Sequence, residues 1–228
     1  MRRIKSKNFE RYEIIVLCCI YLILILNKII FNDSAVSVLS AFFGITYTIL
    51  AGKGNPICYL FGVTGSGLYG YLSFHNALWG NLLLYMGYYV PMQILGYFRW
   101  QKHLKSDKYE IEKTSLSAKE LICIIGLSIV ASSIMIYILI HLGDKRPYID
   151  AITTVLSIVG MYLTVRRAIE QWCFWMVVNG LSAIMWIKIA FDGGKVYSTV
   201  VMWSVYLLLA IYFDIIWRKE LKARKPFC

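Results

Sequence analysis

Long apolar segments recur along this chain, each about as long as a helix needs to be to cross a lipid bilayer. About 20 helical residues span the roughly 30 Å hydrocarbon core of a membrane. Windows of that length give eight segments, near residues 11–31, 34–51, 56–74, 80–100, 119–141, 149–166, 171–190 and 196–217. Turn and breaker residues separate them, as in the stretch from Gly52 to Pro56. The pattern predicts an all-α integral membrane protein with eight transmembrane helices.

The composition agrees with a lipid environment. Of the 228 residues, 59% are hydrophobic and 16% are charged, whereas about a quarter of a soluble domain is charged. The first apolar run is longer than the apolar region of a secretory signal peptide, and it has no small-x-small cleavage site before Asn32. We therefore expect this run to be a retained helix.

The basic residues predict the orientation of the chain. With eight spans and a cytoplasmic N-terminus, all but five of the 24 lysines and arginines fall on the cytoplasmic side; the exceptions are Lys28, Lys145, Arg146, Lys188 and Lys195. Positive charge is concentrated on that side of membrane proteins, so both termini are expected in the cytoplasm. The net charge of +11 then reflects loops that face the anionic lipid bilayer, and no nucleic-acid partner is expected.

The spans fall into two groups of three around a single linker helix. Because one helix separates the groups, both have the same orientation, which is typical of a parallel repeat with the substrate site between the repeats near the membrane midplane. Sliding the chain against itself pairs Gly44 with Gly160, Thr48 with Thr164 and Tyr59 with Trp175. The predicted units are a tail and extra helix (1–33), a first repeat (34–100), a loop and linker helix (101–148), a second repeat (149–217) and a basic tail (218–228).

The segment EQWCFWMVVN, residues 170–179, has an aromatic and amide face that lipid does not require. Helical spacing places Trp172, Trp175 and Asn179 on one side of the helix. A carboxamide in hydrocarbon is costly unless something hydrogen-bonds it. The partner of Asn179 is either another helix or, in our hypothesis, a transported ligand.

The fourth span supplies further candidates for a substrate site. Helical spacing puts Asn81, Tyr85 and Tyr88 on one stripe and Gln93 about 120° away from it. Pro91 can kink this helix and change that relation. The alternative for the tyrosines is anchoring at the interface or core packing, and for the amides it is hydrogen bonding between helices.

Charged and catalytic groups are missing from the patterns that would indicate a pump or an enzyme. No acidic, basic or histidine residue lies near the estimated centre of a span, which favours passive transport over proton coupling. The sequence has no HExxH, CxxC, Walker or GxSxG motif. We therefore expect no catalytic residues, no metal site and no cofactor.

Two of these segments together resemble a known family. YVPMQILGYFRW (89–100) and EQWCFWMVVN (170–179) are similar to segments of the PnuC family of bacterial nicotinamide riboside transporters, and the resemblance covers about residues 34–217. It implies a fold related to the SWEET sugar transporters, with a 3+1+3 helix core that here follows an extra helix. It also implies a homotrimer in the bacterial cytoplasmic membrane. Uptake would be by facilitated diffusion, with the substrate trapped by cytoplasmic phosphorylation for NAD synthesis.

The resemblance also implies roles for individual residues. Trp172, Trp175 and Asn179 match the substrate helix of the family, and Gln93 matches its polar position after the proline. Indole rings can stack on a pyridinium cation with a cation–π contribution of about 0.5 to 2 kcal/mol. Thiamine, or another vitamin or nucleoside carried by relatives of the family, stays open as the substrate, and an integral-membrane enzyme is a weaker alternative.

Overall fold

The computed structural model describes residues 11–31, 35–75, 82–104, 111–141, 143, 146–191 and 197–224. Almost all of these residues are helical, and the extended pairing among them is limited to two isolated bridges. The all-α expectation is therefore confirmed. The elements are α1 (Arg11–Phe31), α2 (Ala35–Gly52), α3 (Cys58–His75), η1 (Leu83–Tyr89), α5 (Val90–Gln101), α6 (Ala118–His141), α7 (Pro147–Val165), α8 (Gln171–Phe191) and α9 (Tyr197–Arg224).

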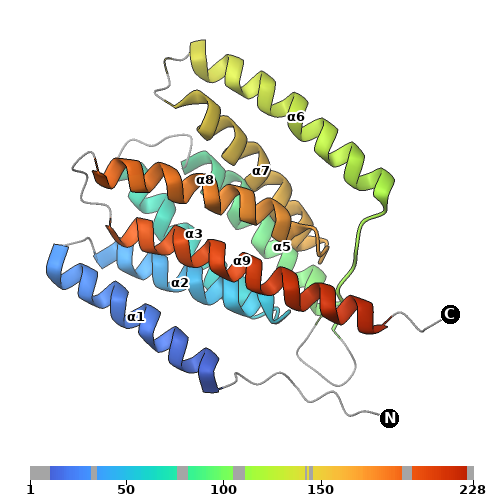
Figure 1. Cartoon of the computed structure of the whole chain (residues 1–228), viewed down its shortest axis with the longest axis horizontal. Coiled ribbons are helices and arrows are strands. Elements are labelled where there is room, and N and C mark those ends of the chain that lie inside the picture. Colours follow the sequence, from blue (N-terminus) through green and yellow to red (C-terminus); the bar gives the residue numbers. More distant parts are fainter. Residues whose placement is uncertain are drawn as a thin grey trace.

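Two groups of three helices form the centre of the molecule. The first triplet is α2, α3 and the continuous helix made by η1 and α5; the second is α7, α8 and α9. The first helix of each triplet packs against the last helix of the other, α2 against α9 and α7 against α5. Helix α1 covers α2 and α9 at one edge, and α6 covers α7 at the opposite edge (Figure 1). This is the arrangement expected of an extra helix plus a 3+1+3 core.

Two buried tryptophans join the triplets by matching hydrogen bonds. Trp100 of α5 donates its Nε1 hydrogen to the carbonyl oxygen of Thr164 in α7 at 3.0 Å. Trp217 of α9 donates to the carbonyl oxygen of Gly52 in α2 at 2.6 Å. Both indoles are 0% exposed. The Gly52 carbonyl is at the end of α2, where the helix offers no partner, whereas the Thr164 carbonyl also accepts from the N–H of Arg167 at 2.9 Å.

The aromatic contacts of these indoles correct the expected alignment of the repeats. Trp100 meets Tyr59 edge-on with ring centroids 5.0 Å apart, and Trp217 meets Trp172 edge-on at 5.5 Å. Tyr59 therefore corresponds to Trp172, one helical turn before the Trp175 that sequence matching paired with it. Few identities support that matching, whereas the packing at the helix ends defines the correspondence directly.

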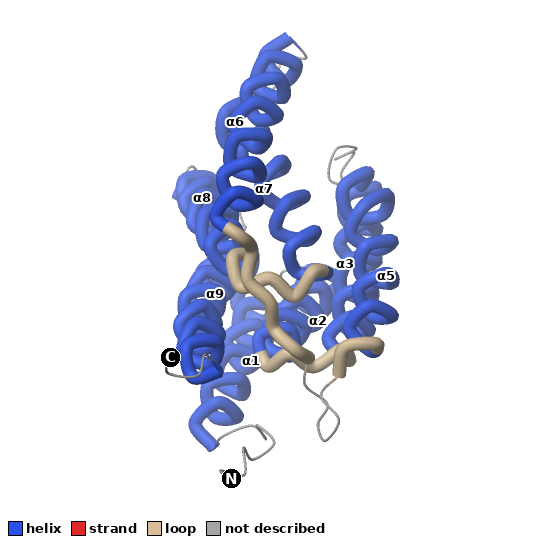
Figure 2. Tube along the Cα trace, turned by 90° about the vertical axis from the view of Figure 1, so that its right-hand side faces the viewer, coloured by secondary structure: helices blue, strands red, loops and turns tan. Residues whose placement is uncertain are grey.

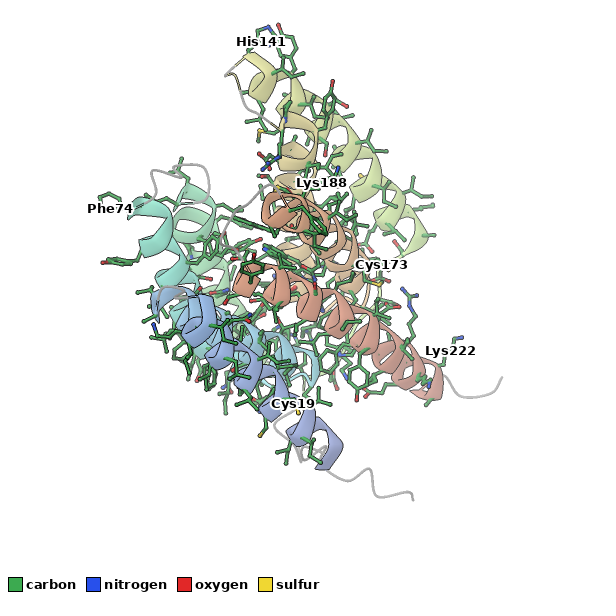
Figure 3. The ribbon with its side chains drawn as sticks, turned by 60° about the vertical axis from the view of Figure 1, so that its left-hand side comes forward. Cys19, Phe74, His141, Cys173, Lys188 and Lys222 are labelled. Carbon is green, nitrogen blue, oxygen red and sulfur yellow. The ribbon has the colours of Figure 1, made fainter. Side chains whose placement is uncertain are left out.

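The loops on one side of the bundle, which we call the basic end, carry Lys53, Lys102, Arg166 and Arg167, and α9 passes this end near Arg218 before it ends at Arg224. Hydrogen bonds between the α2–α3, α5–α6 and α7–α8 loops place them together. His141, the last residue of α6, and Lys222, near the end of α9, lie far apart at opposite ends of the molecule (Figure 3). The connections within and between triplets thus alternate between two ends, as a multi-pass topology requires.

The fourth span departs from α-helical geometry just before Pro91. Residues Leu83–Tyr89 form a π-helix, and the N–H of Val90 bonds to the carbonyl oxygen of Tyr85, five residues earlier. A proline inside an α-helix clashes with the carbonyl four residues before it, and a wider π-turn relieves this clash. Such turns are frequent at functional sites. The side chains before Pro91 are consequently rotated relative to those after it.

Helix α9 continues well beyond the predicted span, to Arg224 rather than 217. Hydropathy marks where a chain leaves the bilayer, and residues 218–224 are mostly charged. Most of these residues are nevertheless good helix formers. An i,i+4 ion pair between Arg218 and Asp214, 2.8 Å long, connects the extension to the rest of the helix. Part of the predicted tail is therefore helical.

By length and composition alone, three of the described helices could cross a membrane: Ala118–His141, Pro147–Val165 and Tyr197–Ala223. Ile14–Ile30 and Val38–Gly52 are shorter apolar stretches. Helices α3 and α8 contain glycine, serine, tyrosine, tryptophan or asparagine among their apolar residues. Such residues lower the hydropathy of a span without shortening it.

We predict that Trp217→Phe will lower the apparent melting temperature of the purified protein. The substitution keeps an aromatic ring but removes the N–H that bonds to Gly52. A buried acceptor left without a partner costs about 1–3 kcal/mol. Thermal unfolding of the detergent-solubilised protein would measure the change. Trp203→Phe is the matched control, because the Trp203 indole has no such bond to any described residue. Equal shifts in the two variants would contradict the stabilising role of the indole bond.

Candidate functional site

A cavity lies between the two triplets, which is where a parallel repeat places its substrate site. The space between its walls, including the part open to the outside, is about 860 Å³. Both triplets contribute to it through six α-helices and the π-helix. The lining residues are Ser40, Gly44, Tyr47, Thr48, Ala51, Gly62, Gly65, Ser66, Tyr69, Tyr85, Tyr89, Gln93, Met161, Thr164, Gln171, Trp172, Trp175, Asn179, Met202, Trp203, Tyr206 and Ala210.

The cavity wall is aromatic and polar but uncharged. None of the described residues that line it is Asp, Glu, Lys, Arg or His. In the part of the chain that the structure covers, no three His, Cys, Asp or Glu side chains are placed to hold a metal ion. Recognition in this cavity therefore depends on ring faces and neutral hydrogen-bonding groups.

Helix α8 contributes the stripe predicted from its sequence. Trp172, Trp175 and Asn179 all line the cavity. The indole Nε1 of Trp175 donates to Thr164 Oγ1 at 3.1 Å, and that hydroxyl donates in turn to the carbonyl oxygen of Gly160 at 2.8 Å. A Cβ on Gly160 would lie 3.0 Å from the Trp175 ring. Helix α7 thus holds Trp175 in a fixed orientation, and the indole N–H of Trp175 already donates to Thr164.

Gln93 occupies the opposite wall, on α5, and is 2% exposed. Its Nε2 donates to Ser66 Oγ of α3 at 3.1 Å, while its Oε1 has no partner among the described residues. Gly62 makes room for this amide, because a Cβ there would lie 3.0 Å from it and 2.8 Å from the ring of Tyr47. The serine fixes one end of the amide and leaves the carbonyl oxygen available to a ligand.

Five buried polar atoms of the cavity wall have no hydrogen-bond partner within the described residues. They are Tyr47 Oη, Gln93 Oε1, Gln171 Nε2, Trp172 Nε1 and Trp203 Nε1. Each unsatisfied buried group costs about 1–3 kcal/mol, and native proteins contain few of them. Their concentration in one cavity indicates a site for a polar ligand that both donates and accepts hydrogen bonds.

Tyrosines form a second aromatic wall, further from the basic end. Tyr69 stacks on Tyr85 with ring centroids 4.4 Å apart and an interplanar angle of 28°. Tyr85 also meets Tyr89 edge-on at 4.8 Å. Trp203 and Tyr206 of α9 make a similar edge-on pair at 5.7 Å. A flat ring that enters the cavity therefore meets aromatic surfaces from both triplets.

The structure brings together five of the seven residues predicted for the site. Trp172, Trp175, Asn179, Gln93 and Tyr85 line the cavity. Asn81 lies outside the described residues.

Tyr88 is the residue that helical spacing misplaces. It is not among the cavity-lining residues, and its hydroxyl donates to the carbonyl oxygen of Ile158 in α7 at 2.8 Å. The expected stripe assumed 3.6 residues per turn, whereas the π-turn before Pro91 directs Tyr85 and Tyr89 to the cavity instead.

Sequence reasoning missed several lining residues from the other helices. Tyr47 on α2, Gln171 at the start of α8 and Trp203 on α9 belong to this group. Gln171 directly precedes the tryptophan motif, so its position was a usable signal. Tyr47 and Trp203 carry no comparable local signal, because their place at the cavity depends on how α2 and α9 pack.

Comparisons with known proteins identify relatives along most of the chain. Residues 34–219 match the family described as "Nicotinamide mononucleotide transporter". A Neisseria mucosa protein named "Nicotinamide riboside transporter PnuC" is 34% identical over 199 residues, which cover 85% of this chain and 76% of the relative. A Haemophilus influenzae protein of the same name is 27% identical over 192 residues, covering 83% of this chain and 82% of its own.

A solved structure shares the fold. The protein described as "Crystal structure of the Vitamin B3 transporter PnuC" superposes with a TM-score of 0.82 at 30% sequence identity, and the match covers 96% of this chain and 95% of the other. The extra helix plus 3+1+3 architecture is thereby confirmed. The family match covers the first triplet, the second triplet up to residue 219, and every described residue that lines the cavity. The chain therefore belongs to the nicotinamide mononucleotide transporter family.

Proposed function

We propose that this protein carries nicotinamide riboside across the bacterial cytoplasmic membrane by facilitated diffusion. The observation that carries this proposal is the aromatic cavity, whose described wall has no charged residue and holds five polar atoms without a partner among the described residues. The names of the Neisseria and Haemophilus relatives support the same substrate. Transport, rather than catalysis, is the activity that such a cavity between two repeats supports.

The chemistry of nicotinamide riboside matches the cavity wall. Its pyridinium ring is a flat cation, which an indole or phenol face attracts. Its carboxamide and ribose hydroxyls both donate and accept hydrogen bonds. Gln93 Oε1 can accept from such a ligand, while Gln171 Nε2 and Trp172 Nε1 can donate to it. Asn179 supplies a further amide in the same wall.

The absence of cations among the described lining residues favours the nucleoside over its phosphorylated form. A phosphate group taken out of water needs a positive partner, because an unpaired buried charge is strongly unfavourable. The family description names the mononucleotide, whereas the named relatives carry the riboside. The composition of this cavity supports the riboside as the substrate.

The lack of charged residues in the described cavity wall also explains how passive transport can accumulate the substrate. An uncharged wall offers no group for proton coupling, so the carrier itself only equilibrates the nucleoside. Phosphorylation in the cytoplasm converts the nucleoside into a nucleotide that this cavity does not accept. The trapped product then serves NAD synthesis.

We propose that the basic end of the bundle faces the cytoplasm, with both termini on that side. The concentration of lysine and arginine there supports this orientation. We also propose the homotrimer that the family resemblance implies. Large apolar side chains exposed on α6, among them Ile122, Leu127 and Ile129, supply a surface for lipid or for a neighbouring protomer.

Asn179→Leu is expected to reduce uptake of nicotinamide riboside into proteoliposomes about tenfold or more. The substitution removes an amide from the cavity wall and leaves ligand groups without a partner, at a cost of about 1–3 kcal/mol. Uptake of radiolabelled substrate measures the effect. Asn27→Leu is the matched control, because Asn27 lies on α1 and is not among the lining residues. Normal uptake by the Asn179 variant would contradict the assignment of Asn179 to the substrate site.

Binding to the purified protein should distinguish the candidate ligands. We expect saturable binding of nicotinamide riboside by calorimetry, and binding of nicotinamide mononucleotide weaker by about 100-fold or more because its phosphate lacks a cation. Trp175→Ala should abolish the binding, whereas Trp186→Ala, outside the cavity wall, should preserve it. Equal affinity for the mononucleotide would contradict the exclusion of phosphate. Binding of thiamine alone would indicate that thiamine, and not nicotinamide riboside, is the substrate.

A further inference from the structure

A short stretch of the loop between α5 and α6 lies across the basic end of the bundle; we call residues 111–116 the strap (Figure 2). Ile111 N–H bonds to the carbonyl oxygen of Gly54, in the loop between α2 and α3, at 2.9 Å. Thr114 N–H bonds to the carbonyl oxygen of Arg167, in the loop between α7 and α8, at 3.0 Å. One stretch of backbone therefore connects equivalent loops of the two triplets.

The two loops have the same local geometry where the strap contacts them. Gly54 and Arg167 each lie two residues after the last residue of a helix, and both have a left-handed backbone, with φ of 72° and 63°. Glycine adopts this conformation freely, but arginine rarely does. The Arg167 guanidinium donates to the carbonyl oxygen of Glu112 in the strap at 3.0 Å. The strap thus helps to hold an unfavourable backbone conformation at Arg167.

An ion pair connects the strap to α9; its lysine side chain is buried and its glutamate side chain is 22% exposed. Lys113 is 5% exposed, and its ammonium group pairs with the carboxylate of Glu220. The same ammonium lies 4.9 Å from the centre of the Trp217 ring, whose N–H bonds to Gly52 of α2. Removing one member of the pair removes this attraction and weakens the connection between the strap and α9. The lysine therefore connects the strap, α9 and the end of α2 in one cluster.

This cluster lies beside one end of the cavity. Ala51 lines the cavity and directly precedes Gly52, the residue to which Trp217 bonds. Ala51 is itself buried. A carrier with alternating access must open each end of its cavity in turn. If the basic end is cytoplasmic, substrate cannot leave toward the cytoplasm until the triplets separate here.

We propose that the strap is a cytoplasmic latch, held closed by the Lys113–Glu220 ion pair, whose release from α9 opens the cavity to the cytoplasm. The proposal rests on the proposed function for the direction in which substrate moves. It assigns the loop between the triplets a role in gating and not only in connection. Loss of the ion pair should therefore increase the population in which the basic end is open.

The test measures how fast a cavity residue is labelled from the cytoplasmic side. Ala51→Cys is introduced into the full chain after its six native cysteines are replaced by serine, and inside-out vesicles are treated with a membrane-impermeant maleimide. Lys113→Met removes the positive charge of the pair, and Glu220→Gln removes the negative charge. One of these variants is sufficient if the other does not fold. Lys113→Arg keeps the charge. Arg218→Met is the matched control, because Arg218 pairs with Asp214 within α9.

We expect labelling about tenfold or more faster in Lys113→Met and Glu220→Gln, with Lys113→Arg and Arg218→Met close to the parent rate. Unchanged labelling in both neutral variants would overturn the latch. So would equally fast labelling in Lys113→Arg, since the charge would then be irrelevant, or in Arg218→Met, which would indicate general loosening. The assay needs no substrate, so failure of nicotinamide riboside uptake in the parent protein would refute the proposed function while leaving this test intact.

Discussion

The packing of each triplet's first helix against the other triplet's last helix determines the architecture of this protein. Buried indole hydrogen bonds from Trp100 and Trp217 join these helix pairs at the basic end. They bond to carbonyls at the ends of α7 and α2. Because both bonds lie at one end, the triplets are held together there, and the space between them further along the helices becomes the cavity.

Some polar side chains of the cavity wall are held in place by hydrogen bonds, and others have polar atoms available to a ligand. Thr164 engages the Trp175 indole, and Ser66 engages one side of the Gln93 amide, so both side chains are held before a ligand arrives. Tyr47, Gln171 and Gln93 each have a polar atom without a partner among the residues that the structure describes. Preorganisation reduces the entropy lost on binding. Neutral partners also keep the complex weak enough for the ligand to dissociate, which a carrier requires.

Helix-level features of this fold were predictable from the sequence, and features that depend on packing were not. The α8 stripe of Trp172, Trp175 and Asn179 was predicted because α8 is a continuous α-helix and its spacing applies directly. Tyr88 was misplaced because the π-turn before Pro91 interrupts that spacing. Tyr47 could not be identified, since its exposure to the cavity follows from neighbouring helices. Helix ends were predicted within a few residues, except where charged residues extend α9 beyond the bilayer.

The π-turn before Pro91 also affects how this site can evolve. It accommodates one additional residue in a turn of the helix, so the tyrosines before it face different neighbours from those that a straight α-helix would give. A relative that replaced the proline could convert the turn and present another side of the same tyrosine-rich segment without substituting any of the tyrosines. Substrate preference in such carriers can therefore diverge through backbone register, and motif spacing alone will not reveal it.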